Sequence, residues 1–600
     1  MISTRRRANY LAVSIALITF IVYLPSLGNG FINWDDDLYV INNVHIRSFD
    51  LHFLKWLFFD FYASYWAPLT WTSHAIDYAV WGLNPWGHHL VNNIFHAVNT
   101  FLAVIVTIRL LEAWNETSIK KKVTKILSER EMLVVGGTVG ILFGLHPLHV
   151  ESAVWVAERK DLLCALFFLL SIISYTAYVR SESNRASRQE LSSRFFDKYY
   201  LITIGFFILA LFSKPMAVSL PAVLLILDWY PFQIIESSTA FRKAIINKIP
   251  FIALSLGMSI IIICAHKAGG AIAPLAMVPL PSRAIVSAHS LIAYFGMMIW
   301  PLNLLPVYTY PTKTTVLSFK YLSSIIFVIA ITVVCFVKAK NNRLWLAAWS
   351  YYIITLAPVL GVIQVGPQAM ADRFTYLPSL GPFFLIGLSA AWFSKHGFAG
   401  TGTGAPVKGV IIVAAFAVCA AMSYVTYKQI GIWKNGIELW TYVIDRDPTR
   451  AFFAYNNRGV CYEKAGLIDK AVDDYKEAIV LNPGDDQAYF NLGVIYQRAG
   501  AQNKAIEYYN DSLAINPNRA EAFHNRGVIY FQNRQPGRAL DDFDRAIELN
   551  PEMVIAYYNR ATLYLRTNRQ DLALFDFRKA CDLGSEDACK ALASGELSFK

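Results

Sequence analysis

Runs of mainly apolar residues recur along the first 430 positions of the chain and do not recur after them. A membrane-spanning helix needs about 20 such residues, because the hydrocarbon core of a bilayer is about 30 Å thick. We predict eleven spans, at 8–27, 89–112, 132–149, 161–180, 198–213, 215–231, 248–266, 320–338, 344–362, 379–394 and 408–428. A further apolar stretch, 284–300, is expected to be re-entrant or interfacial, because a crossing there would place the later basic loop on the outer side.

The net charge of +11 is concentrated in short loops between the apolar segments. These loops are Arg5–Arg7, Lys120–Lys125, Arg180–Arg194, Arg242–Lys248 and Lys338–Arg343. Cytoplasmic loops of membrane proteins carry such an excess of Lys and Arg. We therefore expect a cytoplasmic N-terminus on an uncleaved first span. The same distribution, without any nucleic-acid-binding motif, argues against a nucleic-acid partner.

With this orientation, four loops and the whole C-terminal tail face outward. They are 28–87, 147–160, 267–319, 363–378 and everything after 428. The unusual polar residues of the chain lie in these outer segments. We expect an integral membrane protein with an extracytoplasmic tail, in which a Cys581–Cys589 bridge could form.

The tail contains an internal repeat with a period of 34 residues. Its units begin "YNNRGVCY", "YFNLGVIY", "FHNRGVIY" and "YYNRATLY", at Tyr455, Tyr489, Phe523 and Tyr557. This period and pattern are those of the tetratricopeptide repeat, TPR, a pair of antiparallel helices. The predicted fold is all-α: a polytopic helix bundle over 1–430, a linker over 431–450, and a TPR α-solenoid of about four repeats over 451–600. Such arrays usually bind peptides in a concave groove, and a rigid spacer is the alternative.

Three adjacent carboxylates, Asp35, Asp36 and Asp37, follow the first span in "FINWDDDLYVINN". Like charges and partial burial raise the pKa of a carboxyl group, which suits it to act as a general base on a hydroxyl. Adjacent carboxylates also hold divalent cations. A solvated interfacial patch explains the same residues equally well.

Histidines and a glutamate mark two further outer regions. His89 and His96 share a helical face in "WGHHLVNNIFHAVNT", where interhelical hydrogen bonding is favoured over catalysis. His146, His149 and Glu151 lie in "LHPLHVES", where Pro147 interrupts the helix and disfavours a regular pair of metal ligands.

Cations lie at several outer ends of the predicted spans: Arg159, Lys160, Lys214 and Arg373. Arg offers a bidentate fork to phosphate and Lys a point charge, whereas the alternative role is interfacial anchoring. The chain has no P-loop or Rossmann glycine motif, so a cytoplasmic nucleotide donor is not indicated. The combination favours transfer from a lipid phosphate.

Several long motifs together resemble one family. They are "WDD", "APLTWTSHAIDYAVWGLNPWGHHLVNNIFHAVN", "LFGLHPLHVESAVWVAERKDLL", "SKPMAVSLPAVLLILDW" and "ADRFTYLPSLG", followed by the repeats. The chain resembles the transmembrane and TPR O-mannosyltransferases of eukaryotes and their bacterial relatives, and as one of the bacterial type it is expected in a bacterial inner membrane. The resemblance implies a GT-C glycosyltransferase fold with an acidic motif in the first outer loop.

The resemblance also implies roles for particular residues. Asp35 and Asp36 match the family's acidic pair, with Asp35 as the base and Asp36 positioning it. Arg373 matches the arginine before "YLPS", and Lys214 matches a lysine that Glu follows in eukaryotic members, where this chain has Pro215. That departure leaves the geometry of this loop open.

The expected activity is therefore transfer of a sugar from a polyprenyl-phosphate donor to a Ser or Thr hydroxyl of an exported protein held in the TPR groove. Lys214, Arg373, Arg159 and Lys160 are expected to bind the lipid phosphate. The expected pocket-lining residues are His89, His96, His146, His149, Glu151, Asp372 and Tyr376. No cofactor is required, although Asp35 and Asp36 could hold Mg²⁺ or Mn²⁺. The alternatives are a GT-C enzyme with a lipid or glycan acceptor and a non-enzymatic TPR scaffold.

Overall fold

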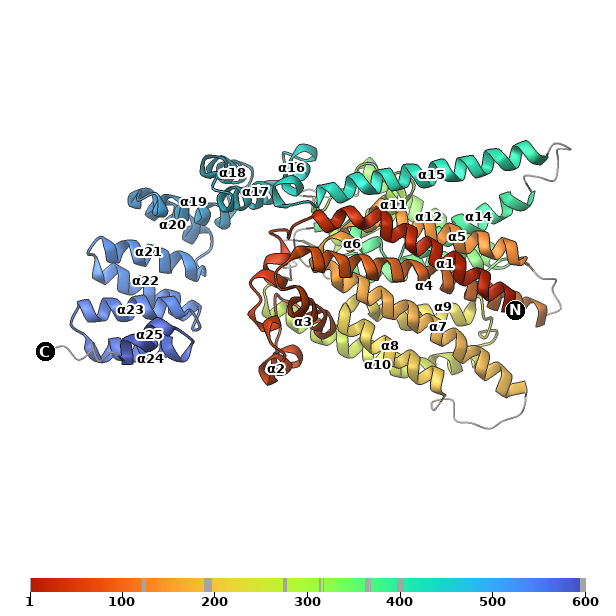
Figure 1. Ribbon diagram of the computed structural model, residues 1–600, viewed down its shortest axis with the longest axis horizontal. Coiled ribbons are helices and arrows are strands. Elements are labelled where there is room, and N and C mark those ends of the chain that lie inside the picture. The colour runs from red at the N-terminus through yellow and green to blue at the C-terminus, as the bar shows by residue number, and fades with distance from the viewer. Residues whose placement is uncertain are drawn as a thin grey trace. The chain divides into compact units, whose positions relative to one another are not determined.

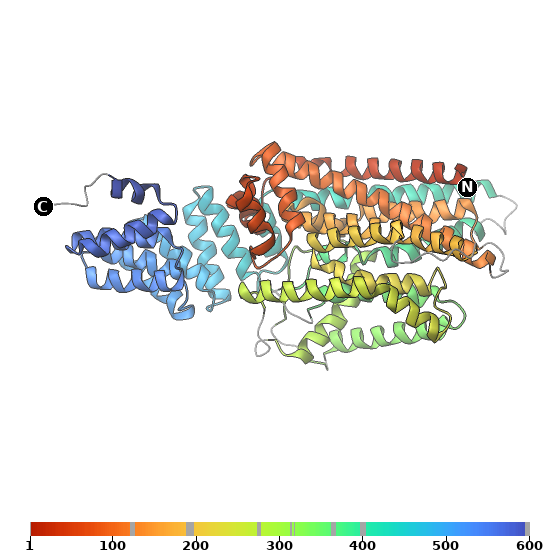
Figure 2. The ribbon, with the colours of Figure 1, turned by 90° about the horizontal axis from the view of Figure 1, so that it is seen from below.

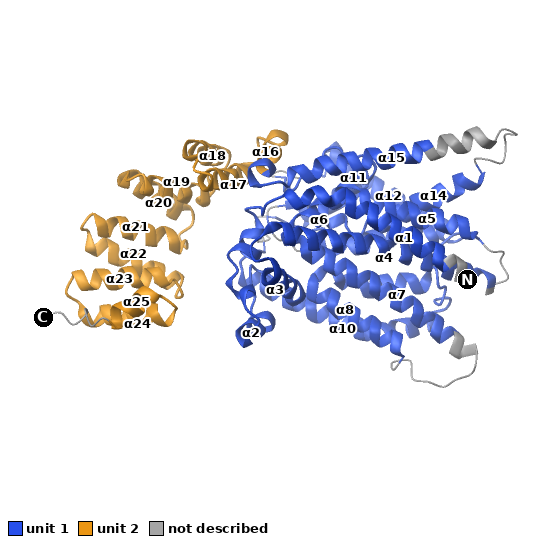
Figure 3. Ribbon diagram, in the orientation of Figure 1, with its two compact units in different colours: residues 1–439 blue, residues 440–600 orange. Residues whose placement is uncertain are grey.

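The chain forms two compact units, Met1–Leu439 and Trp440–Lys600 (Figure 3). The computed structural model describes residues 2–120, 126–187, 197–272, 278–311, 315, 316, 318–361, 366, 368–396 and 404–593. Within these residues the only sheet is a short antiparallel pair, β1 (Tyr308–Thr309) with β2 (Gln368–Met370). The all-α prediction is confirmed. Parts of the expected basic loops, 121–125 and 188–196, lie outside the described residues.

Unit 1 is a bundle of long helices (Figure 1). Its α-helices are α1 (Ile2–Tyr23), α2 (Leu51–Phe59), α3 (Pro68–Trp81), α4 (Pro85–Lys120), α5 (Glu129–Leu145), α6 (Val150–Val154), α7 (Arg159–Ser187), α8 (Lys198–Ser213), α9 (Leu220–Trp229), α10 (Ser238–Ala268), α11 (Leu280–Ile299), α12 (Phe319–Ala339), α13 (Leu344–Leu356), α14 (Leu380–His396) and α15 (Gly404–Ile432).

Seven helices of the described chain are long and apolar enough to cross a membrane, or eight if one bent pair is a single span. The prediction of eleven spans is therefore not met. The bent pair is 129–145 with 147–154, which meet at 53° where Pro147 interrupts the helix. Three other predicted spans correspond to shorter apolar helices, Lys198–Ser213, Pro215–Trp229 and Leu344–Val359.

The stretch expected to be re-entrant forms α11, which is long and apolar enough to cross. Two contacts hold its C-terminal half. The Tyr294 hydroxyl accepts from the Ala371 N–H at 3.1 Å, and the Met298 carbonyl lies 3.0 Å from His146 Nε2. Both contacts join α11 to the end of the bundle where the segment 368–379 and the C-terminal end of α5 meet.

The segment that follows α1 lies beside the C-terminal end of α15. The Gly30 N–H donates to the Lys434 carbonyl at 2.8 Å, and Asn29 Nδ2 donates to the Ile430 carbonyl at 3.2 Å. The N-terminus of α1 lies at the opposite end of unit 1 from α2 and α3 (Figures 1 and 2). The first polar loop and the exit to the tail therefore share one end of the bundle.

Unit 2 stacks antiparallel helix pairs, as the 34-residue repeat predicts. Its helices, with α16 bridging from unit 1, are α16 (Gly436–Arg446), α17 (Phe452–Lys464), α18 (Ile468–Leu481), α19 (Asp486–Arg498), α20 (Gln502–Ile515), α21 (Ala520–Gln532), α22 (Pro536–Leu549), α23 (Val554–Arg566), α24 (Gln570–Asp582) and α25 (Glu586–Ala593). The expected linker, 431–450, is largely helical because α16 occupies it. A disulfide joins Cys581 to Cys589 across the last turn.

The repeat position Gly493 shows how tightly each pair packs. A Cβ atom there would lie 2.6 Å from the ring of Tyr509 on the next helix. Gly459 meets the ring of Tyr475 at the same distance. The glycines therefore set the close approach of the two helices within a repeat.

Candidate functional site

A cavity of about 580 Å³ opens in unit 1 beside the first polar loop. Its wall contains one carboxylate from that loop, Asp35, and three cations, Lys160, Lys214 and Arg373. These four residues come from four separate segments of the chain. Four of the residues predicted from sequence for the acid–base and phosphate roles therefore lie around one space.

Asp35 and Asp36 have different environments although they are adjacent. The Asp35 side chain is 31% exposed and lies 3.8 Å, Oδ2 to Nζ, from Lys160. Asp36 is fully buried, and its two oxygens accept the N–H groups of Ile32 at 2.9 Å and Ala157 at 2.8 Å. Asp36 therefore ties the loop to the segment before α7, while Asp35 faces the cavity.

Burial changes the proton affinity of both carboxyl groups. It raises the pKa of Asp35, and the nearby Lys160 ammonium opposes this rise. Burial also raises the pKa of Asp36, to about 7, despite the two N–H groups that favour its charged form. A carboxylate with a raised pKa is a better acceptor for the proton of a hydroxyl group.

Glu158 lies at the centre of the three cations. It belongs to a short 3₁₀ helix, η5 (Val156–Glu158), which the chain enters by a bend at Trp155. Its Oε1 lies 3.1 Å from Lys160 Nζ and 3.2 Å from Arg373 Nε, and its Oε2 lies 3.2 Å from Lys214 Nζ. The carboxylate therefore fixes three cations around one point at the cavity wall.

Two further carboxylates, Asp161 and Glu151, pair with two of these cations. Asp161 Oδ1 lies 2.5 Å from Lys214 Nζ. Glu151 pairs with the Arg373 guanidinium, and its second oxygen accepts the Arg373 backbone N–H at 2.8 Å. Both cations are therefore held in position without any ligand.

The remainder of the cavity wall is largely apolar and aromatic. Aliphatic side chains come from the segment after Lys214, from α10 and from the turn after α13: Met216, Val218, Ile262, Ile263, Pro358 and Val359. Tyr39 covers Lys160, whose ammonium lies 4.8 Å from the ring centroid. The cavity thus places three cations, with Glu158 between them, beside an apolar surface.

Arg159, expected at the phosphate site, lies elsewhere. Its NH2 group donates to Asp77 at 2.6 Å and to the His88 carbonyl at 2.9 Å, and its NH1 group donates to Ser73 at 2.9 Å. It is fully buried and is not among the described residues that line the cavity. Its neighbour Lys160 takes the place at the cavity because consecutive helical residues point in different directions.

The seven residues expected to line the pocket lie behind its wall or farther away. None of them is among the described residues that line the cavity. The seven are His89, His96, His146, His149, Glu151, Asp372 and Tyr376. Most of them are joined to other parts of the bundle by hydrogen bonds. His96 Nδ1 lies 2.8 Å from the Tyr376 hydroxyl, and His149 Nε2 lies 3.1 Å from Ser379 Oγ.

The other members of this set also have structural partners. His146 contacts the Met298 carbonyl, and Asp372 accepts from the Tyr308 hydroxyl at 2.8 Å. His89 Nε2 lies 3.4 Å from the Gly30 carbonyl. His89 therefore contacts the loop after α1, Asp372 contacts β1, and His146 contacts α11.

Sequence reasoning did not assign Glu158, Tyr39 or Tyr65 to the site, although all three line the cavity. The charges of "ERKD" indicated a polar cluster, but they gave no basis for separating the central Glu158 from its neighbours. The tyrosines gave no signal, because aromatic residues are common at membrane interfaces.

Comparisons with known proteins identify the repeats of the tail. Tetratricopeptide-repeat family models match residues 452–485, 487–519, 520–553 and 554–585. The crystal structure of MamA is 24% identical and covers 26% of this chain and 89% of that chain, with a TM-score of 0.23.

Three relatives extend the comparison. Protein O-mannosyl-transferase Tmtc2 of Drosophila melanogaster is 32% identical over 184 residues, which is 29% of this chain and 18% of the relative. Protein O-mannosyl-transferase TMTC4 of Mus musculus is 26% identical over 241 residues, 38% and 31% respectively. Protein O-mannosyl-transferase F38B6.6 of Caenorhabditis elegans is 22% identical over 484 residues, 78% and 62%.

The chain is thus a distant relative of the TMTC protein O-mannosyltransferases, and it carries TPR repeats. It spans less than two thirds of the length of each of these three relatives. It is an integral membrane protein with several candidate spans.

Proposed function

We propose that this protein is a membrane glycosyltransferase that moves a sugar from a polyprenyl-phosphate donor to a Ser or Thr hydroxyl of a protein bound by the TPR unit. One observation carries the proposal: a single cavity contains a partly exposed carboxylate, three preorganised cations and an apolar wall. The relatives are named protein O-mannosyl-transferases, so a mannose-phosphate lipid is the first donor to test.

The three cations are suited to the leaving phosphate. In this proposal a phosphate group in the cavity contacts Lys160, Lys214 and Arg373, which also remain paired with Glu158. The first units of the lipid pack against the aliphatic wall. Preorganised donors around developing negative charge are worth about 3–4 kcal/mol each when one is removed in other enzymes. Arg159, which points away from the cavity, has no part in this scheme.

Asp35 is suited to act on the acceptor. Its carboxylate takes the hydroxyl proton as the hydroxyl oxygen forms a bond to the anomeric carbon of the sugar. The bond between that carbon and the phosphate oxygen breaks, and its electron pair stays with the phosphate. The sugar is transferred with inversion, and Asp36 keeps the loop in place. No step uses a metal ion.

The orientation of the membrane unit is part of the proposal. We place the cavity and the tail on the extracytoplasmic side, because Arg5–Arg7 lie in the first turns of α1, whose N-terminus is at the other end of unit 1. The Cys581–Cys589 disulfide supports this side for the tail, since disulfides persist in oxidising compartments. A reporter fused after residue 600 tests the orientation, and a cytoplasmic reporter signal would contradict an exported acceptor.

The substitution Asp35→Asn tests the chemistry. It keeps the size of the side chain and removes the proton acceptor, so we expect sugar transfer by the purified protein to fall by about 10²–10⁴-fold. Asp37→Asn is the matched control, because it removes the same charge two positions away and Asp37 does not line the cavity. Asp37→Asn should retain transfer.

Three other outcomes favour different functions. Transfer that survives Asp35→Asn would show that the base is another group. Transfer to lipids or glycans, with no glycosylated protein in the host, would favour a different acceptor. Loss of a protein complex from cells without the protein, with no transfer to any acceptor, would favour a scaffold.

A further inference from the structure

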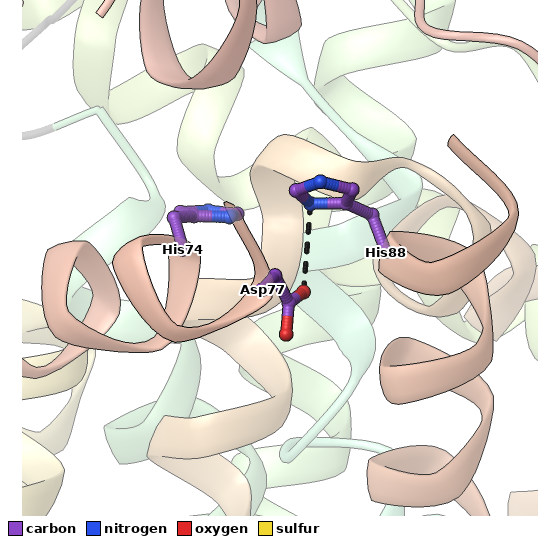
Figure 4. A group of neighbouring side chains, drawn as sticks. All are labelled: His74, Asp77 and His88. Carbon is purple, nitrogen blue, oxygen red and sulfur yellow. Dashed lines mark ion pairs between the residues drawn. The ribbon is translucent and has the colours of Figure 1, made fainter. Parts of the chain in front are cut away.

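A second cluster of ionisable side chains lies outside the cavity and has no role in the proposed chemistry. Helix α3 carries His74 and Asp77, and the first turn of α4 brings His88 against them (Figure 4). One ligand atom from each residue lies within 4.8 Å of the other two. All three side chains are buried.

The hydrogen bonds of His88 fix which of its nitrogens carries a proton. His88 Nε2 lies 3.0 Å from the Gly82 carbonyl oxygen, which can only accept, so Nε2 carries the hydrogen. In the neutral imidazole, Nδ1 is then an unprotonated nitrogen with a lone pair. This lone pair faces Asp77 Oδ2 at 3.5 Å. Two electron-rich atoms this close in a buried site require a cation between them or an additional proton.

The side chain of His74 also lacks hydrogen-bond partners. Neither of its ring nitrogens has a hydrogen-bond partner among the described residues, although the side chain is fully buried. Nearly all buried polar groups in proteins are paired, and each that is not needs an explanation. One ion between His74 and His88 would account for one unpaired nitrogen of each ring.

We propose that His74, Asp77 and His88 bind a divalent transition-metal ion, and that Zn²⁺ is the ion this set of donors suits. Tetrahedral Zn²⁺ binds nitrogen and oxygen at about 2.0–2.2 Å, which places neighbouring ligand atoms about 3.4 Å apart. The distance between His88 Nδ1 and Asp77 Oδ2 is 3.5 Å. The donation from His88 to Gly82 is of the kind that orients metal-binding histidines.

The position of the cluster suggests what the ion does. Arg159 donates to Asp77 Oδ2 at 2.6 Å, so this carboxylate also neutralises the first residue of α7. The next residue along the chain is Lys160, in the cavity wall. An ion here would fasten α3 to α4 and keep the start of α7 in place, while remaining outside the cavity.

The test measures metal in the full-length protein, purified with an affinity tag that contains no histidine. We expect about one Zn²⁺ per chain by elemental analysis, as for a single site. His74→Gln and His88→Gln should each lose most of this metal. His89→Gln is the matched control, because His89 is the adjacent buried residue and lies outside the cluster, so it should retain the metal.

A second measurement on the unchanged protein covers the case in which the variants do not fold. After removal of metal and addition of Co²⁺, we expect the visible absorption of a four-coordinate site with nitrogen and oxygen ligands, and recovery of the melting temperature lost on chelation. Wild-type protein without stoichiometric metal, and with a melting temperature unaffected by Zn²⁺ or Co²⁺, would overturn the proposal. Equal loss of metal in His89→Gln would also overturn it.

Discussion

At the scale of single residues, the candidate site depends on the ion pairs that Glu158 forms with three cations. The carboxylate holds Lys160, Lys214 and Arg373 within 3.1–3.2 Å. Charges brought this close in a buried wall are costly unless each has partners of the opposite sign. Asp161 is the second partner of Lys214, Glu151 that of Arg373, and Asp35 that of Lys160. Each cation should therefore respond differently to substitution, according to what else it contacts.

Lys160 controls the proton affinity of Asp35. Burial raises the pKa of this carboxyl group and Lys160 lowers it, so Lys160→Met should raise the pKa of Asp35 further. The base acts only when deprotonated, and activity therefore falls as the pH drops through that pKa. We expect the acidic limb of the kcat/KM profile to move to higher pH in Lys160→Met. Lys395→Met removes the pair with Glu131, and neither residue lines the cavity, so this control should leave the limb in place. A shift to lower pH would contradict the assignment of Asp35.

Replacement by Lys should affect activity at Arg373 and stability at Arg159. Arg373 lines the cavity, so loss of its planar fork should lower kcat/KM by about 10²–10³-fold. Arg159 holds α3, α4 and α7 together and does not line the cavity, so Arg159→Lys should mainly lower the melting temperature. Donor kinetics and thermal unfolding of both variants provide the check. Equal kinetic defects at equal stability would contradict this division.

Some of these residues could be predicted from sequence and others could not. Asp35, Lys160, Lys214 and Arg373 stand out because charge at a membrane boundary is costly and needs a reason. Arg159 stands out for the same reason. The sequence does not show which of the adjacent residues Arg159 and Lys160 faces the cavity, because this depends on how the chain turns into α7 after the bend at Trp155. The histidines satisfied the same criterion but serve as buried hydrogen-bond partners. Glu158 requires knowledge of three distant cations, which no local pattern contains.

At the scale of elements, periodicity predicted the TPR helices well and the membrane helices less well. The repeat fixes each helix by a 34-residue register, whereas a span is recognised only by its length and hydropathy. Helices such as Lys198–Ser213 and Pro215–Trp229 are apolar but short. They can be buried among other helices, so composition alone does not show how much bilayer each crosses.

The repeat glycines provide a test of helix packing in the tail. Gly493→Ala would place a Cβ atom 2.6 Å from the Tyr509 ring, so we expect it to destabilise the TPR unit by about 1–3 kcal/mol, as overpacking does. Gly537→Ala is the control on α22, where the added atom meets nothing within 4 Å. It should not destabilise the unit and should stabilise it by at most about 0.5 kcal/mol, because Gly537 lies in the first turn of α22, where the preference for Ala over Gly is weaker than in the middle of a helix. Denaturant unfolding of residues 440–600 measures both, and a neutral Gly493→Ala would contradict the close packing.

At the scale of the whole molecule, the last membrane helix supports the first polar loop. Trp433 stacks on Trp155 at 5.5 Å, and Trp155 stacks on Trp34 at 4.4 Å, next to Asp35. Trp433 is 1% exposed. The end of α15 is therefore part of the structure that positions the cavity.

This arrangement predicts where the tail can be removed. A chain ending at Leu439 keeps Trp433 and Lys434 and should bind the donor with a melting temperature near that of the intact membrane unit. A chain ending at Lys428, the end of the predicted last span, loses both and should be less stable by about 3–5 kcal/mol, as for removal of a buried Trp. Donor binding and thermal unfolding of the two chains in detergent distinguish them. Equal stability would contradict a supporting role for residues 429–439.

The hydrogen bond between Gly30 and Lys434 has a mechanical consequence. Tension applied to the chain beyond Leu439 would reach this bond through residues 434–439. The protein therefore has a short force path from the segment that leads to its repeats to the group proposed to accept the proton. Engagement of a partner and readiness of the base can be coupled along it without any movement of the bundle.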